Sequence, residues 1–216
     1  MKNVSLFDFD GTITRKDTIK ILIQELLRNR PLKIFHAFSL LVKIFLESDD
    51  HITQENKNKL IGEMIKGLSY EELEKPLNNF KQRVSKIIRP LIIEAFNESN
   101  RHNSVVLIVT ASPDFSVKKA LEDFDVCVIG TQFEKYDKKF TGKLVGLNCY
   151  DEEKINRINN WTLSYNIDAN FIECWGDSLS DLPMMKLAEN HNWIVNKKNM
   201  ADIKELDPDA NLHYLV

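Results

Sequence analysis

The sequence predicts an α/β fold, in which a doubly wound parallel sheet carries an inserted all-helical domain. Short apolar runs alternate with helical patterns from residue 104 onward, and one such run also stands at the N-terminus, as in sheets covered by helices on both faces. Between these regions, residues 16–100 show only helical patterns and no Gly/Ser-rich linker. A chain of 216 residues is long enough for one domain with such an insertion.

The first strand leads into two carboxylates. Apolar residues from Val4 onward run into Asp8 and Asp10, and Gly11 marks the end of the strand. Side chains two residues apart share a face of a strand, so both carboxylates are expected to emerge together at its carboxyl end, where open α/β sheets bind ligands. Neighbouring carboxylates repel unless a cation or a shared proton compensates, and Mg2+ takes oxygen ligands of this kind. A pair of solvated acids is the alternative.

The inserted block is expected to consist of successive helices. Apolar spacing and start signals predict them over residues 18–28, 32–46 and 53–66, from Ser69 onward, and after Pro90. Ser69 and Glu72 form a capping box at the start of the fourth helix. Pro76 is expected to kink or delay that helix, because proline lacks the amide hydrogen.

From Ser104 onward the pattern alternates between strands and helices. Residues 105–109 form a continuous apolar run, which is typical of a strand covered on both faces. Ser112 and Pro113 suit the N-cap and the first turn of a helix that runs through Asp123. The remaining expected elements are a strand at 126–129, a hairpin over 133–145, a helix from Asp151 to about Tyr165, a strand at 171–175, a helix from about Ser180 and a short final strand at 193–195.

Charge and cysteine content exclude some functions and suggest a compartment. A net charge of −3 and a pI of about 6.0 give no whole-chain signature of nucleic-acid binding, so no nucleic-acid partner is expected. The three cysteines are scattered and odd in number, which favours a reducing compartment over a disulfide framework. Charges at Lys2, Asp8 and Asp10 interrupt any signal-peptide core. A soluble, cytoplasmic protein is therefore expected.

Polar residues also follow other predicted strands. Thr110 and Ala111 come directly after residues 105–109 and suit an anion, although a simple helix cap is the alternative. Lys154 stands in the first turn of a predicted helix, where the helix dipole disfavours a cation; the alternative is an exposed lysine balanced by the preceding acids. Asp177 and Asp181 repeat the carboxylate pattern after a strand, and the dipole explains only Asp181.

This order of motifs, DxDGT, a threonine after a strand, a lysine and then GDSxSD, resembles the haloacid dehalogenase superfamily of phosphohydrolases. The resemblance covers essentially the whole chain and is closest to the phosphoserine-phosphatase-like branch, subfamily IB. In that branch a helical C1-type cap is inserted between the first two motifs. The resemblance implies a Rossmann-like catalytic core at residues 1–15 and 101–216 and a helical cap at residues 16–100.

The resemblance also implies a mechanism. Asp8 would be the nucleophile that forms an aspartyl-phosphate, and Asp10 would protonate the leaving alkoxide and then act as base on water. Mg2+ would be held by the Asp8 carboxylate, the Asp10 backbone carbonyl and Asp177. Asp181 would be either a direct ligand or a residue that supports the direct ligands.

The same resemblance assigns the phosphate-binding groups. The Thr110 side chain and the Ala111 amide would hold phosphate oxygens. Lys154 would neutralise the phosphate and restrain Asp8, and a bound dianion would then explain the position of Lys154 near a helix start.

The expected substrate is a small phosphorylated metabolite. In the phosphoserine phosphatases that the chain resembles, an acid at the spacing of Asp17 faces the substrate amine; the alternative is that Asp17 caps the following helix. Thr110-Ala111-Ser112-Pro113 departs from the Ser-Gly-Gly of those enzymes. Only Arg83 and Arg89 are loose candidates for their carboxylate-binding arginine, so a phosphoserine-like substrate is one option among several.

Residues 32–46 support an alternative substrate class. This segment is apolar almost all round, which is typical of a packed helix or an oligomer contact and also of a peripheral membrane contact. Together with the Thr-x-Ser-Pro motif, it resembles the phosphatidylglycerophosphate phosphatases of the same superfamily. A phospholipid head-group phosphatase is therefore the alternative function. A phosphotransferase and a non-catalytic metal-binding protein are less favoured, and no oligomeric state is predicted.

Overall fold

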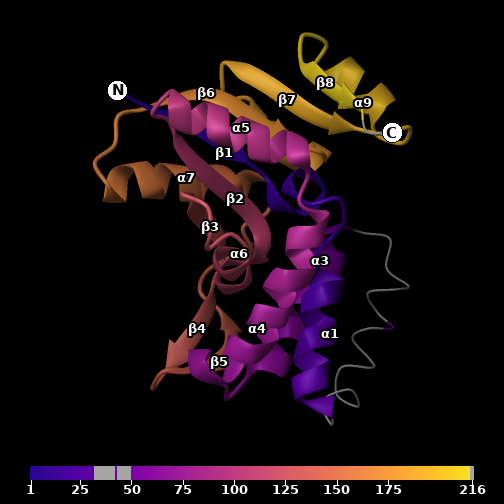
Figure 1. Ribbon diagram of the computed structural model, residues 1–216, viewed down its shortest axis with the longest axis vertical. Helices are drawn as coiled ribbons and strands as arrows, with labels where there is room; N and C mark the ends of the chain where they lie inside the picture. The colour runs from indigo at the N-terminus through magenta and orange to yellow at the C-terminus, as the bar shows by residue number, and fades with distance from the viewer. Residues whose placement is uncertain (32–41, 43–49, 215–216) are drawn as a thin grey trace.

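The computed structural model describes residues 1–31, residue 42 and residues 50–214. The helix expected over residues 32–46 falls outside the described residues except for Val42, as does its expected contact with a membrane. The described residues form a sheet wrapped by helices, with a helical arm that extends from one end of it (Figure 1).

The main sheet has six strands in the order β3-β2-β1-β6-β7-β8, and every neighbouring pair is parallel. These strands are β1 (Lys2–Phe7), β2 (Val105–Pro113), β3 (Cys127–Thr131), β6 (Ala169–Gly176), β7 (Asn190–Val195) and β8 (Asn211–Tyr214). Phe7, the last residue of β1, is in register with Ile108 of β2 and Trp175 of β6. The segments that follow these three strands therefore meet at one edge of the sheet, as the doubly wound α/β prediction requires.

Both faces of the sheet are covered, because alternate residues of the central strands enter separate hydrophobic clusters. Val4 and Leu6 pack with Leu107 in one cluster, whereas Phe7 packs with Ile108 in the other. The covering helices are α5 (Pro90–Arg101), α6 (Asp114–Ala120), α7 (Glu152–Ser164), α8 (Leu182–Met185) and α9 (Met200–Leu206). The α/β fold class is confirmed.

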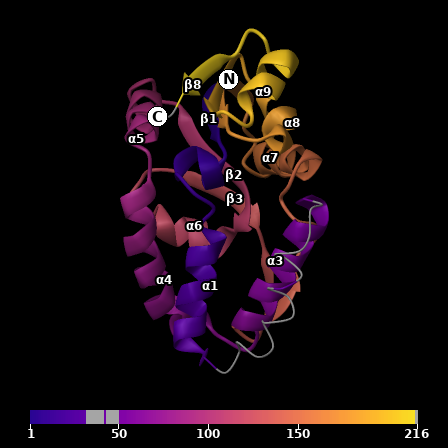
Figure 2. The same cartoon turned by 90° about the vertical axis from the view of Figure 1, so that its right-hand side faces the viewer.

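The helical arm contains α1 (Ile19–Asn29), α3 (Asp50–Ile65) and α4 (Tyr70–Val84), together with a hairpin of β4 (Phe133–Tyr136) and β5 (Lys139–Leu144). Figure 2 shows these elements below the sheet. The hairpin reaches α3 backbone to backbone: a Cβ at Gly62 would lie 2.1 Å from the carbonyl oxygen of Gly142. Only glycine fits at such an approach.

Helix α5 contacts the sheet although it belongs to the range expected for the cap. The Phe96 ring packs edge-on against the Phe7 ring with centroids 4.9 Å apart. The Ser99 hydroxyl donates to Oε1 of Glu173 at 2.8 Å and lies 3.0 Å from the hydroxyl oxygen of Ser5. The division into a cap at 16–100 and a core at 1–15 and 101–216 stays a prediction.

Several local predictions hold and others need correction. The capping box of Ser69 and Glu72 is present at the start of α4. Pro76 lies inside α4 and does not delay its start. The predicted helix cap at Ser112 and Pro113 is wrong, because β2 continues through Pro113 and α6 begins at Asp114 and ends at Ala120. The Ser112 hydroxyl instead donates to the carboxylate of Asp10.

The C-terminal part of the sheet is longer than predicted. The strand at 193–195 is part of β7 but is not the last one, because α9 and the edge strand β8 follow it. Asp151 stands at the N-cap of α7 as expected, but its side chain makes no capping hydrogen bond.

Candidate active site

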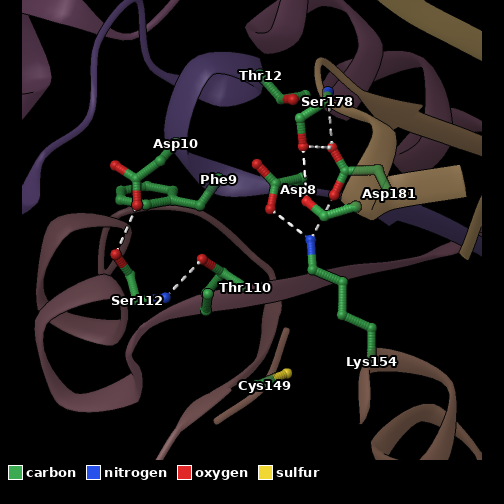
Figure 3. A network of polar contacts seen from close by, with 12 residues as sticks. Asp8, Phe9, Asp10, Thr12, Thr110, Ser112, Cys149, Lys154, Ser178 and Asp181 are labelled. Carbon is green, nitrogen blue, oxygen red and sulfur yellow. Dashed lines mark hydrogen bonds and ion pairs between the residues drawn. The ribbon is translucent and has the colours of Figure 1, made fainter. Parts of the chain in front are cut away.

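The chain leaves β1 in a turn over Phe9–Ile13 whose backbone is not helical at Asp10 and Gly11, so Asp10 lies inside the turn and Asp8 directly precedes it. Because the strand ends at Phe7, the alternation of side chains does not continue to Asp10, and the two carboxylates do not share the same partners. Figure 3 shows Asp8 directed toward Lys154 and Asp10 directed toward Ser112. Both acids nevertheless line one cavity of about 100 Å³.

Lys154 links two acids from opposite ends of the sequence. Its Nζ lies 2.7 Å from Oδ1 of Asp8 and 2.6 Å from Oδ1 of Asp181, and its side chain is 1% exposed. Burial alone would lower the pKa of Lys154, but the carboxylates of Asp181 and Asp8 outweigh it and raise the pKa. The lysine is therefore cationic, and these two partners compensate for its position near the start of α7.

Asp8, Asp177 and Asp181 form a compact acidic cluster. Each offers a carboxylate oxygen, and these atoms all lie within 4.8 Å of one another. Burial and, after it, the charge of Asp181 raise the pKa of Asp177, which is about 7. Burial likewise raises the pKa of Asp8, against the attraction of Lys154. Crowded oxygen donors of this kind suit Mg2+, whose charge would relieve the repulsion.

The backbone is shaped to hold this cluster. Gly11 has a φ of +89°, and a Cβ at this position would lie 2.1 Å from Oδ2 of Asp177, so the approach requires glycine. Thr12 donates from its hydroxyl to Oδ1 of Asp177 at 3.2 Å. Oδ2 of Asp181 accepts from the backbone amides of Asp177 and Ser178 at 3.2 and 3.1 Å. With Lys154 on its other oxygen, the carboxylate of Asp181 is better placed to support the cluster than to contact a metal directly.

Asp10 is held by donors from two other segments. Its Oδ1 accepts from the Thr18 amide at 2.6 Å, and its Oδ2 accepts from the Ser112 hydroxyl at 2.5 Å. Burial and then the charge of Asp17 raise the pKa of Asp10, the hydrogen bonds from Ser112 and Thr18 lower it, and the resulting pKa is about 6. A carboxyl with this pKa can exchange a proton near neutral pH. Its carboxylate is not part of the acidic cluster.

The predicted phosphate-binding residues lie on the same cavity. Thr110 is buried, and its Oγ1 accepts from the Ser112 amide at 3.0 Å (Figure 3). Thr110, Ala111 and Lys154 all line the cavity with Asp8 and Asp10. The sheet thus brings together groups that are distant in sequence, around a space small enough for a phosphate-sized group.

These observations agree with a comparison of the whole sequence. A family model described as haloacid dehalogenase-like hydrolase matches residues 5–186. The chain belongs to this family. It is therefore a hydrolase of the haloacid dehalogenase type, as the order of its motifs implies.

Known proteins are similar to this hydrolase over most of its length, in sequence or in fold. Protein CicA of Caulobacter vibrioides (strain NA1000 / CB15N) is 25% identical over 192 residues, which is 88% of this chain and 84% of CicA. A structure of a protein with unknown function from Bordetella pertussis Tohama I has a TM-score of 0.80 at 18% identity, covering 98% of both chains. A substrate-bound phosphoserine phosphatase has a TM-score of 0.60 at 19% identity, covering 94% of this chain and 90% of that one.

In this haloacid dehalogenase-type hydrolase, Asp17 caps the following helix, which is one of the two alternatives for this residue, and a contact with a substrate amine stays a prediction. Its Oδ1 accepts from the Ile19 amide at 2.8 Å, which caps α1. Its Oδ2 lies 2.8 Å from Nζ of Lys57 in α3. Both residues line the same cavity as Asp8 and Asp10, which we name the catalytic cavity after the role proposed for these acids. Sequence reasoning did not identify Lys57, since nothing in the helical pattern of α3 marks it.

The two candidate arginines make other contacts. Arg83 pairs with the buried Glu25 at 2.6 Å, and Arg89 donates to the backbone carbonyls of Gly11 and Thr12 at 3.0 and 3.1 Å. Neither lines the cavity. Arg89 instead stabilises the turn that carries Asp10.

Cys149 lies below the site but does not fit the role of a nucleophile (Figure 3). Burial raises the pKa of its thiol to about 11, so the thiolate is scarce at neutral pH.

A second, larger cavity of about 830 Å³ adjoins the catalytic cavity, and Gln54, Asn58 and Tyr150 line both.

No helix within residues 1–31 and 50–214 has the length and apolar character needed to cross a membrane.

Proposed function

We propose that this hydrolase cleaves phosphomonoesters through an aspartyl-phosphate on Asp8. One observation carries the proposal: Asp8 lies both in the acidic cluster with Asp177 and Asp181 and on the catalytic cavity with Asp10. A nucleophilic carboxylate, an acid–base carboxyl and a cation-binding cluster are the groups that such a reaction needs.

In the first step, an oxygen of Asp8 attacks phosphorus and the bond from phosphorus to the leaving oxygen breaks. Asp10 gives its proton to that oxygen, because an alkoxide is a poor leaving group. Lys154 holds Asp8 in place and reduces the repulsion between carboxylate and phosphate. Thr110 and the Ala111 amide would bind the phosphate oxygens that do not react. Mg2+, held by Asp8, Asp177 and the Asp10 carbonyl, would supply further neutralisation of charge.

In the second step, Asp10 takes a proton from a water molecule that attacks the phosphorus. The bond between phosphorus and Asp8 breaks, and inorganic phosphate leaves. The pKa of about 6 for Asp10 suits both steps, since the group must give and then accept a proton near neutral pH.

The substrate is proposed to be a small phosphorylated metabolite. A phosphoserine phosphatase is among the proteins of similar fold, so phosphoserine-like compounds are among the candidate substrates. The apolar sequence of residues 32–46 supports a second candidate, a phospholipid head group of the phosphatidylglycerophosphate type, with peripheral contact to the membrane. A cytoplasmic location and the absence of a nucleic-acid partner stay predictions.

A phosphomonoester panel with and without Mg2+ tests this function. We expect release of inorganic phosphate in Mg2+, loss of activity in excess chelator, and loss of at least about 1,000-fold in the Asp8→Asn variant. Acid-quench trapping of phosphate on wild-type protein should label Asp8. Full activity of Asp8→Asn would overturn the assignment, and flotation with vesicles would separate the lipid candidate from soluble substrates.

A further inference from the structure

The catalytic cavity contains an ion pair that the proposed chemistry does not use. Asp17 and Lys57 are 2.8 Å apart, and both line the cavity. Both oxygens of Asp17 have donors, one from Lys57 and one from the Ile19 amide. Lys57 retains donor capacity, because an ammonium carries three N–H groups.

This pair alters the charge that the cavity offers to a substrate. A substrate ammonium would need Asp17, which is already neutralised, and would lie close to Lys57, a like charge. A substrate anion would instead attract Lys57. The Asp17 side chain is 40% exposed, so water reaches its carboxylate and weakens its attraction for Lys57, whose side chain is 19% exposed. Lys57 can therefore leave Asp17 and bind a substrate anion with little loss of folding stability.

A second donor stands beside Lys57. Asn58, the next residue of α3, is 6% exposed and lines both the catalytic cavity and the larger cavity that adjoins it. Its Nδ2 has no hydrogen-bond partner among the residues that the structure describes. Buried amide donors are normally satisfied, so this one favours an acceptor supplied by a ligand.

We infer that Lys57 and Asn58 form a specificity site for the leaving group, which selects phosphomonoesters that carry a second anionic group and disfavours those with an ammonium. This inference rests on the proposed phosphatase function. Two sources share the required chemistry: the carboxylate of a small metabolite and the phosphodiester of a lipid head group. In this proposal, the positive charge of Lys57 on α3 selects the substrate, and Asp17 does not bind a substrate amine.

Four soluble phosphomonoesters separate the two charges. D-3-phosphoglycerate carries a carboxylate, O-phosphoethanolamine an ammonium, O-phosphoserine both and glycerol 3-phosphate neither. With wild-type protein and Mg2+, we expect the highest kcat/KM for D-3-phosphoglycerate and the lowest for O-phosphoethanolamine. Phosphatidylglycerophosphate in mixed micelles forms the lipid arm. A preference for it over D-3-phosphoglycerate identifies the phosphodiester as the source.

The Lys57→Gln variant gives the decisive comparison. It should lower kcat/KM for the preferred anionic substrate by about 10- to 100-fold, mainly through KM, because a charge-assisted hydrogen bond is lost. It should raise kcat/KM for O-phosphoethanolamine, because Asp17 is left unpaired. Glycerol 3-phosphate should change by no more than about twofold. Asn58→Leu should lower kcat/KM for the anionic substrate in the same direction.

Lys81→Gln is the matched control. Lys81 lies on α4 outside the cavity, pairs with Glu122 and Asp123, and has a side chain 22% exposed, close to that of Lys57. This variant should leave all four kcat/KM values unchanged. An equal effect of Lys57→Gln on all substrates, or an unchanged carboxylate preference, would overturn the inference.

Failure of the proposed function gives a different result. Wild-type protein would then hydrolyse none of the panel, including p-nitrophenyl phosphate. Calorimetric titration of D-3-phosphoglycerate into Asp8→Asn protein still tests the site without turnover. A Kd about tenfold weaker in the Asp8→Asn, Lys57→Gln double variant supports the inference, and an equal Kd overturns it.

Discussion

Ser112 donates a hydrogen bond of 2.5 Å to Asp10, although 102 residues separate them in the sequence. The bond joins the end of β2 to the turn after β1. It therefore fixes the orientation of Asp10, the proposed acid, relative to Thr110, which accepts a hydrogen bond from the Ser112 amide. Ser112 is therefore a positioning residue for proton transfer, and it is not the helix cap that the sequence suggests.

The Ser112→Ala variant tests this role. We expect kcat to fall by about 10- to 100-fold for alkyl phosphates, because a misplaced acid loses part of a contribution of about 100- to 10,000-fold. p-Nitrophenyl phosphate should be affected much less, since its leaving group needs no proton. Ser112→Thr, which keeps the hydroxyl, should recover activity. An equal loss on both substrates would count against a role in proton transfer.

Lys154 should contribute to stability as well as to catalysis. Replacing it by methionine leaves Asp8 and Asp181 buried without their cation, which is expected to lower the free energy of unfolding by about 3–5 kcal/mol. Urea unfolding without Mg2+ measures this loss. Adding Asp181→Asn to Lys154→Met should recover part of it, because one uncompensated charge is removed. A double variant no more stable than Lys154→Met would show that the charges are not the cause.

Binding of Mg2+ should raise the melting temperature through the acidic cluster. At a concentration of about 100 times Kd, a ligand stabilises the folded state by about 2.7 kcal/mol, which corresponds to a shift of roughly 5–10 °C in a domain of this size. Differential scanning fluorimetry measures the shift. Asp177→Asn should remove most of it, whereas Asp202→Asn, at the exposed start of α9, should leave it intact. The same shift in Asp177→Asn and wild-type protein would place the ion elsewhere.

His213 should make stability sensitive to mild acid. Its ring stacks on Trp175 with centroids 4.6 Å apart, and burial lowers its pKa below the ordinary value of 6.5. The folded state therefore favours the neutral ring. The contribution of His213 is fully present above about pH 6.5 and is lost as the pH falls toward the lowered pKa. The difference in Tm between pH 7.5 and pH 5.5 should be smaller in His213→Gln; an equal difference would assign the effect to other groups.

The parts of the site that depend on local sequence could be predicted. Asp8 and Asp177 each follow an apolar strand, and parallel strands place such residues at one edge of the sheet. Lys154 is a candidate mainly through its place in the order of motifs, because local sequence also allows an exposed lysine, and its two carboxylate partners explain its position near a helix start. The capping box of α4 is likewise a local signal.

The parts that depend on tertiary contacts could not be predicted in this way. Ser112 looks like a helix cap in sequence, and only the fold places Asp10 next to it. Lys57 is one of two lysines on α3, a helix with little amphipathic pattern, and its pairing with Asp17 depends on how α3 packs. Strand β8 is short and lies at the sheet edge, so its sequence lacks the long apolar run that would predict a strand.

The central position of β1 also affects how the protein is made. This strand is synthesised before both of its neighbours, β2 and β6, and the second of these ends at Gly176. At translation rates of about 5–20 residues per second, the strand waits many seconds for its last partner. Until β6 has been synthesised, the backbone N–H and C=O groups along one edge of β1 lack their strand partner, and an unpaired edge of this kind favours aggregation.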